Sequence, residues 1–228
     1  MSRGSQVIKT TAIYFIGNFA SKLLAFFLLP LYTTYLTSED FGNVDLLIST
    51  LPLIAPIFTM QVTESVFRFL CSDENMEGKK KTITNSFIIF FTGILVFIVL
   101  YIPFVIRFDL SYALLFFAYF LVTYLGIFFQ QILRGLQRTT EYALTGVIST
   151  IIHATMNILL IVKFKMGGES LLISSVAGSL VVTVFIALRI KIWEFIDLTK
   201  ISKLEIKKQL QYGVPLIPNQ ISWWIIGL

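Results

Sequence analysis

The sequence predicts an all-α membrane protein: a polytopic bundle of six transmembrane helices followed by the start of a seventh. Hydrophobic residues make up 56% of the 228 residues, charged residues make up only 14%, and the mean hydropathy is +0.83. These values lie far from those of soluble globular domains. Apolar runs of about 20 residues recur along the chain, which is the length that a helix needs to cross roughly 30 Å of hydrocarbon.

Hydropathy divides the chain into spans that short links join. The expected spans are residues 11–36, 42–70, 83–106, 110–133, 141–162 and 170–190, with a last one beginning at about residue 211. We therefore expect three parts: an N-terminal six-helix transmembrane lobe over residues 1–192, a cytoplasmic linker over 193–208, and the beginning of helix seven over 209–228.

The first span carries a lysine, Lys22, about halfway along its apolar run. Placing a lysine at that depth costs about 2.5 to 3.5 kcal/mol on insertion scales. The side chain is also too short to reach water with ease. We therefore expect Lys22 to face a polar interior, together with Asn18 and Ser21, which share its helical face by their spacing.

The second span carries a polar face of its own. Its members stand at i, i+3, i+4 and i+7, and they are Gln61, Glu64, Ser65 and Arg68. Glu64 and Arg68 are spaced to pair along the helix. Because the first two spans run antiparallel with a short link, Glu64 is expected near the depth of Lys22. This predicts a cluster of Lys22, Glu64 and Arg68 with excess positive charge; the alternative is that Glu64 merely neutralises two cations in a structural group.

The fifth span carries a polar stripe of Ser149, His153 and Asn157 at i, i+4 and i+8. His153 is the single histidine of the chain. Its side chain could titrate near neutral pH and couple transport to protons. The alternative is a histidine that is hydrogen-bonded between two helices.

The distribution of lysine and arginine orients the chain. The N-terminus, the second and fourth links and the segment after the sixth span carry lysines, arginines or both, whereas the first link has none and the third has only Arg107. The positive-inside rule then places the N-terminus in the cytoplasm.

In the linker, apolar residues such as Trp193 and Leu204 alternate with lysines, which predicts an amphipathic helix on the inner leaflet. A plain solvated connector is the alternative.

Several function classes lack support. Cys71 is the only cysteine, so neither an intrachain disulfide nor a thiolate metal cluster is expected. A lone histidine predicts no metal site, and no HExxH motif, phosphate-binding glycine loop or nucleophile elbow occurs. We expect no enzyme activity, no cofactor and no nucleic-acid partner.

Pro30, Pro52 and Pro56 predict helix bends, which suit a gate and a static bundle equally well.

Four short patterns are arranged in order along the chain. They are residues 36–42 (LTSEDFG), 64–69 (ESVFRF), 133–142 (LRGLQRTTEY) followed by the helix of Asn157, and 212–218 (YGVPLIP) leading into Trp223 and Trp224. Their order and spacing resemble the Wzx-type bacterial polysaccharide flippases, which belong to the MOP superfamily with the lipid II flippases and the MATE drug exporters. Ser21 and Lys22 also stand where the lipid II flippases have a serine and a cavity-lining arginine.

The resemblance implies a transporter that moves a polyprenyl-pyrophosphate-linked oligosaccharide from the cytoplasmic to the outer leaflet of the bacterial inner membrane. It implies that Lys22 helps to form a cationic cavity for the pyrophosphate, although a lysine lacks the bidentate fork of an arginine. The drive would be an ion gradient, of H⁺ or Na⁺. Other polysaccharide-assembly proteins are expected partners.

Such transporters resemble two six-helix lobes, and this chain supplies one lobe and the start of helix seven. We therefore expect a fragment or a truncated gene product that lacks a second lobe, rather than a half-size protein that dimerises. A single lobe is not expected to perform alternating access, because one repeat has to move against another. The competing readings are a MATE-like exporter of cationic drugs, a membrane-embedded sugar transferase or polymerase, and an inactive or purely structural subunit.

Overall fold

The computed structural model describes residues 26, 28–108 and 112–227, and all its regular elements in these ranges are helices. The longer helices run through Ser38–Thr59 (α2), Val62–Ser72 (α3), Met76–Phe108 (α4), Ala113–Gly135 (α5), Thr139–Ile158 (α6), Glu169–Ile190 (α7), Lys203–Gly213 (α8) and Ile217–Gly227 (α9). A π-helical turn, Leu159–Lys163, extends α6. The predicted all-α class is therefore confirmed.

Five of these helical segments are long and apolar enough to cross a membrane. They are Ser38–Thr59, Met76–Arg107, Ala113–Gly135, Thr139–Lys163 and Glu169–Ile190. The last four agree closely with predicted spans, and Ser38–Thr59 covers the first part of the second predicted span. Most of the first span lies outside the described residues, where only 28–35 form a continuous helical stretch, so the expected number of six spans plus a seventh stays a prediction.

The second predicted span is wrong in its middle, because residues 42–70 do not form one helix. Met60 and Gln61 both adopt left-handed backbone conformations, with φ of 50° and 51°, and these end α2 and precede α3. Two consecutive left-handed residues cannot continue a right-handed helix. The Gln61 carbonyl accepts hydrogen bonds from the amides of Glu64 (3.1 Å) and Ser65 (3.3 Å), and these bonds form the first turn of α3.

Two glycines of other helices lie against this break. A Cβ atom on Gly93 of α4 would sit 1.9 Å from the Phe58 carbonyl oxygen, and one on Gly213 at the end of α8 would sit 2.4 Å from the Met60 carbonyl oxygen. Only glycine permits backbone approaches this close. The break between α2 and α3 is therefore packed by backbone from two sides.

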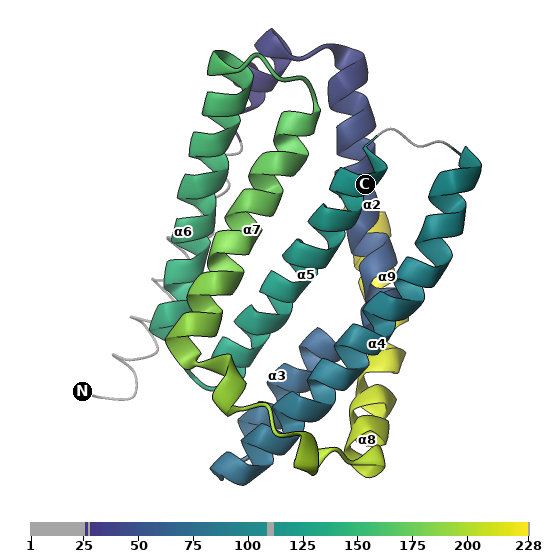
Figure 1. Ribbon diagram of the computed structural model, residues 1–228, viewed down its shortest axis with the longest axis vertical. Coiled ribbons are helices and arrows are strands. Elements are labelled where there is room, and N and C mark those ends of the chain that lie inside the picture. Colours follow the sequence, from purple (N-terminus) through teal and green to yellow (C-terminus); the bar gives the residue numbers. More distant parts are fainter. Residues whose placement is uncertain (1–25, 27, 109–111, 228) are drawn as a thin grey trace.

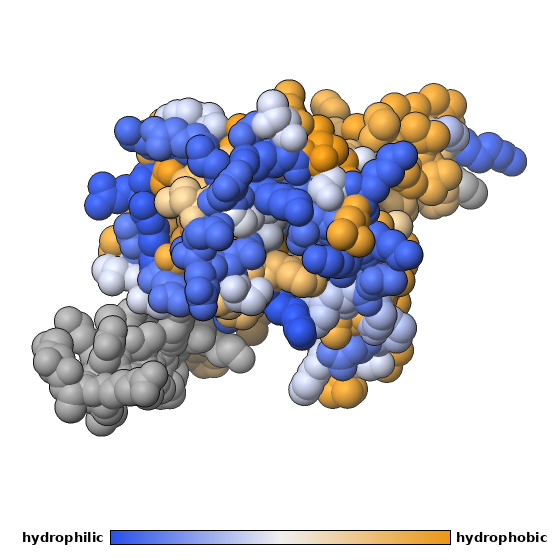
Figure 2. All heavy atoms as spheres, turned by 90° about the horizontal axis from the view of Figure 1, so that it is seen from below, coloured by the Kyte–Doolittle hydropathy of each residue, from blue (hydrophilic) through white to orange (hydrophobic). Residues whose placement is uncertain are grey.

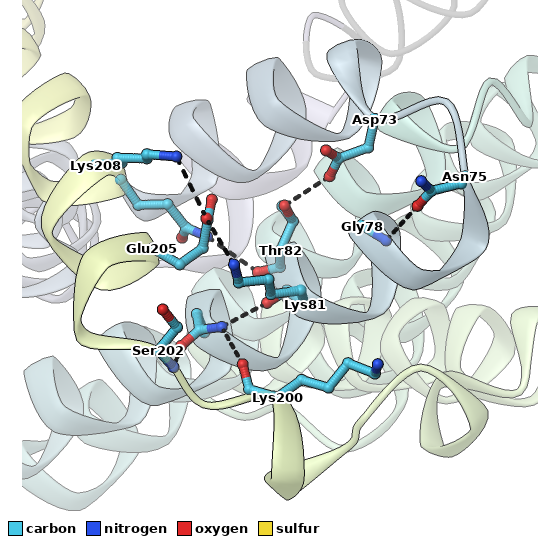
Figure 3. A network of polar contacts seen from close by, with 11 residues as sticks. Asp73, Asn75, Gly78, Lys81, Thr82, Lys200, Ser202, Glu205 and Lys208 are labelled. Carbon is cyan, nitrogen blue, oxygen red and sulfur yellow. Dashed lines mark hydrogen bonds and ion pairs between the residues drawn. The ribbon is translucent and has the colours of Figure 1, made fainter.

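The linker also differs from the prediction, because residues 193–208 do not form one amphipathic helix. The chain instead makes two 3₁₀ turns, Ile192–Glu194 and Leu198–Lys200, before α8 begins. Figure 3 shows why: the linker lies along the first turns of α4 and is bonded to it. Asn85 donates to the Lys200 carbonyl (3.0 Å) and accepts from the Ser202 amide (2.9 Å).

Further polar contacts join α8 to α4. Gln209 accepts from the Ser86 hydroxyl (2.7 Å) and donates to the Thr82 carbonyl (3.1 Å). Glu205 forms an ion pair with Lys81 (3.7 Å). Asn85, Ser86 and Gln209 are fully buried. Because buried polar groups need partners, this set fixes the path of the linker. We call the contacts of Thr82, Asn85, Ser86, Gln209 and Glu205 the linker clasp.

The helices form one bundle in which α5, α6 and α7 run side by side and α4 diverges from them toward one end (Figure 1). Aromatic side chains fill the core between α4 and α5, where the rings of Phe90 and Phe128 stack at 4.9 Å and those of Phe97 and Phe120 lie 4.1 Å apart. The end that holds α3, the start of α4 and α8 is covered mainly by hydrophilic side chains (Figure 2). We call this end the polar end.

Candidate functional site

A chain of polar contacts links α3 to α5 near the polar end. The Gln131 amide donates to the Glu64 carboxylate (3.0 Å), and the Arg134 guanidinium donates to the Gln131 side-chain oxygen (2.8 Å). Gln131 and Arg134 are three residues apart, so both side chains lie on one face of α5. Gln131 is buried, and Glu64 and Arg134 are half-buried. The amide thus connects one carboxylate with one guanidinium, and the charge of this group is balanced.

The predicted pair between Glu64 and Arg68 is wrong. No ion pair joins these two residues in the part of the chain that the structure describes; Glu64 is bonded to Gln131 instead. The Arg68 side chain is exposed and its guanidinium lies over the Tyr212 ring, 4.5 Å from the centroid. The positive charge of Arg68 is therefore not neutralised by the acid of its own helix.

The other members of the predicted cluster have mixed outcomes. Gln61 is buried, but it precedes α3 instead of standing on its polar face. Asn18 and Lys22 lie outside the described residues. Their place beside Glu64 and Arg68 stays a prediction.

His153 and Asn157 lie together between α6 and α7. His153 Nε2 is 3.1 Å from the Ser175 hydroxyl of α7, and the Asn157 amide donates to the His153 carbonyl (2.9 Å). Asn157 is fully buried. His153 is thus hydrogen-bonded between two helices, as the second of the two sequence interpretations requires. Its coupling to protons is untested.

The structure does not bring His153 to the Glu64 group. Gln131 lies four residues before the end of α5, whereas His153 lies fourteen residues after the start of α6. At 1.5 Å per residue, this separates the two groups by roughly 15 Å along the bundle. The predicted site residues therefore form two groups at different depths.

Sequence reasoning missed several polar partners. Neither Gln131 nor Arg134 is among the site residues predicted from the sequence, although their spacing of three residues marks a shared polar face. Asp45 was also missed, although a carboxylate inside an apolar span is a functional candidate by default. Among the described residues, no group of three or more histidine, cysteine and acidic side chains is placed to hold a metal ion.

The helix order and packing are those of a known class of membrane protein fold. The chain matches a MATE structure in complex with Br-NRF with a TM-score of 0.63 and 19% sequence identity, covering 96% of this chain and 56% of the other. It matches MATE in a straight conformation with a TM-score of 0.62 and 18% identity, covering 95% and 53%.

A third similar structure is a MOP superfamily transporter from Pyrococcus furiosus, described as having a binding pocket of reverse polarity. Its TM-score is 0.58 at 18% identity, covering 93% of this chain and 50% of the other. These likenesses establish the MOP-type fold, and the chain spans about half the length of these transporters. Residues 7–228 match the model of the polysaccharide biosynthesis protein family, and the chain belongs to that family. No curated protein matches the sequence.

Proposed function

We propose that this chain is the N-terminal lobe of a Wzx-type flippase, which moves a polyprenyl-pyrophosphate-linked oligosaccharide from the cytoplasmic to the outer leaflet. The product would be capsule, O-antigen or exopolysaccharide. The observation that carries the proposal is the family match over residues 7–228, because polysaccharide biosynthesis requires glycans to cross a membrane. The MOP-type fold supports transport as the way in which they cross.

The charges of the lobe suit an anionic headgroup. Moving a pyrophosphate through hydrocarbon is costly, and a hydrated cationic cavity lowers that cost while the lipid tail stays in the bilayer. Arg68 is exposed and stacked on Tyr212, and a stacked guanidinium keeps its in-plane N–H donors free to meet phosphate oxygens. In this proposal Lys22 adds a second cation from the first span. A second lobe would close the cavity, and an H⁺ or Na⁺ gradient would drive the cycle.

The orientation follows from the charges at the polar end. The first turns of α4 contain Lys79, Lys80 and Lys81. Arg138 donates to the Arg189 carbonyl (3.3 Å). The ends of several helices therefore contribute to one basic region. The positive-inside rule then assigns the polar end and the N-terminus to the cytoplasm of a bacterial cell.

A MATE-like exporter of cationic compounds is the second candidate. The fold likeness to MATE structures favours it, as does the carboxylate of Asp45 in a pocket of the lobe. The two candidates differ in the charge of the substrate, because a drug cation needs acidic partners and a pyrophosphate needs basic ones.

Complementation of a flippase-deficient strain tests the proposal. The complete gene is expected to restore surface polysaccharide, whereas Lys22→Ala and Arg68→Ala are expected to reduce it at least tenfold at equal membrane expression. Lys207→Ala, which removes an exposed lysine from α8, is the matched control and should restore it fully. Failure of the complete gene, with resistance gained to a cationic dye, would favour the exporter. Full activity of both cavity variants would refute the assigned site.

A further inference from the structure

A pocket of about 450 Å³ lies among α2, α5, α6, α7 and the helical residues 28–35. This volume falls in the range of roughly 300 to 1,000 Å³ that is common for small-molecule sites. His153, which bonds to Ser175 across α6 and α7, is one of its lining residues. The predicted polar stripe of the fifth span therefore opens onto a cavity.

One part of the pocket wall is aromatic. Tyr32 and Phe41 contribute neighbouring rings whose centroids are 6.0 Å apart, and Tyr119 of α5 contributes a third ring. All three side chains are only half-buried. Flat rings at the wall of a cavity offer apolar faces against which another flat or ring-shaped group can stack.

The rest of the wall combines aliphatic side chains, such as Ile48 and Leu171, with hydrogen-bonding groups. Asp45 of α2 contributes a carboxylate, Ser149 a hydroxyl, and His153 an imidazole. No ion pair joins Asp45 to another residue within the described ranges. A carboxylate in a membrane-spanning helix is costly, so its presence beside a cavity marks a polar occupant.

A neighbouring pocket shows that this lining is not the rule in the lobe. That pocket, of about 380 Å³, lies among α2, α4 and α5 and is lined mostly by apolar side chains such as Ile54, Phe58 and Phe97. A cavity of that kind suits a lipid chain. The pocket of Asp45 and His153 instead combines stacking surfaces with donors and acceptors.

We infer that the pocket of Asp45 and His153 is a subsite for a sugar residue of the transported glycan; the inference rests on the proposed function. A pyranose ring presents an apolar C–H face, which stacks on aromatic rings, and an edge of hydroxyl groups. The hydroxyls donate to the Asp45 carboxylate and exchange hydrogen bonds with Ser149 and His153. The aromatic wall and the polar wall of the pocket thus match the two sides of a sugar.

This subsite binds the glycan, whereas the cationic residues bind the pyrophosphate. Residues that bond to hydroxyls discriminate between ligands, because a bound ligand without the hydroxyl shields the polar groups of the site from water and leaves them unpaired. Asp45, which bonds to hydroxyls, and Tyr119, which stacks on the sugar ring, therefore determine which glycans are accepted, whereas Arg68 and Lys22 contribute to binding of all lipid-linked pyrophosphates.

Binding measurements on the purified full-length protein test this division. The probes are bare polyprenyl pyrophosphate and the same lipid bearing an oligosaccharide long enough to span the roughly 15 Å between the two groups, ending in glucose, galactose, N-acetylglucosamine or N-acetylgalactosamine. We expect at least one glycosylated lipid to bind about tenfold more tightly than the bare lipid. Asp45→Asn and Tyr119→Ala should abolish this tenfold preference and leave binding of the bare lipid unchanged. Glu39→Gln, at an exposed acid of the same helix, should keep the preference.

Three outcomes overturn the inference. Equal affinity of the wild-type protein for bare and glycosylated lipids would refute the sugar subsite but leave the proposed function intact. Binding of neither lipid by the wild-type protein would refute both. A Na⁺-dependence of folding stability that disappears in Asp45→Asn, with the sugar preference retained, would assign the pocket to a cation. Thermal unfolding of each variant, compared with that of the wild type, separates these results from misfolding.

Discussion

At the scale of single residues, Glu64, Arg134 and Arg68 each contact a side chain that is distant in the sequence. Glu64 is separated by 67 positions from Gln131, to which it is bonded. The Arg134 guanidinium, in turn, lies over the Phe67 ring at 4.4 Å. Arg68 lies over Tyr212 in the same way. Stacking on a ring lowers the cost of withdrawing a guanidinium from water while its donors stay usable. Of the two, the exposed Arg68 suits the proposed site, which has to bind and release an anion.

A pH effect belongs to this scale. The Thr199 hydroxyl and amide both donate to the Asp197 carboxylate, and these bonds lower the pKa of Asp197 below its ordinary value. The stabilisation is therefore present above the pKa of the unfolded chain and is lost as the pH falls through the lower, folded value. Carboxyl NMR titration should show the lowered pKa, and Thr199→Val should raise it. An unchanged pKa in Thr199→Val would contradict the assignment.

At the scale of the elements, the break between α2 and α3 is held by close backbone contacts. Gly213→Ala should be strongly destabilising, because its Cβ would lie 2.4 Å from the Met60 carbonyl oxygen. We expect a loss of about 1 to 3 kcal/mol, in the range of overpacked sites. Gly146→Ala is the matched control, since no atom lies within 4 Å of its Cβ and alanine favours a helix interior. Thermal unfolding in one detergent would compare them, and equal melting temperatures would refute the contact.

The linker clasp is the second device at this scale. Asn85→Ala removes a buried side chain that bonds to the linker backbone on both sides of Ile201. We expect faster hydrogen exchange at the Ser202 amide by at least tenfold, which corresponds to about 1.4 kcal/mol of lost local stability. Asn43→Ala, at an exposed asparagine of α2, should leave that exchange rate unchanged. The clasp would have no role in holding the linker if both variants exchanged at the wild-type rate.

At the scale of the whole molecule, the unequal distribution of charge between its two ends determines the proposed orientation of the lobe in the membrane. Cys71 is exposed near the end of α3, at the polar end, and it is the only cysteine in the sequence. A membrane-impermeant maleimide should therefore label it in opened cells but not in intact ones. Cys71→Ser combined with Arg107→Cys moves the thiol to the last turn of α4, and this variant should be labelled from outside. Labelling of Cys71 in intact cells would reverse the proposed orientation.

The sequence by itself determined the class of the protein and the approximate limits of four of the five described membrane-spanning helices. These follow from local properties, because the length and hydrophobicity of a run decide whether it can cross a bilayer. The order of the short patterns, which is a property of the chain alone, also pointed to a polysaccharide transporter of the MOP type, and the Wzx type stays a prediction.

Only the tertiary structure decided where the second span breaks, which partner Glu64 takes and how the linker runs. Met60 and Gln61 are left-handed where backbone from Gly93 and Gly213 packs against the break. Glu64 prefers Gln131 over Arg68 because α5 brings that amide against α3. The linker forms short turns instead of one helix because Asn85 and Gln209 bind it to α4. In each case the deciding contact joins residues from different helices, and helical periodicity carries no information about it.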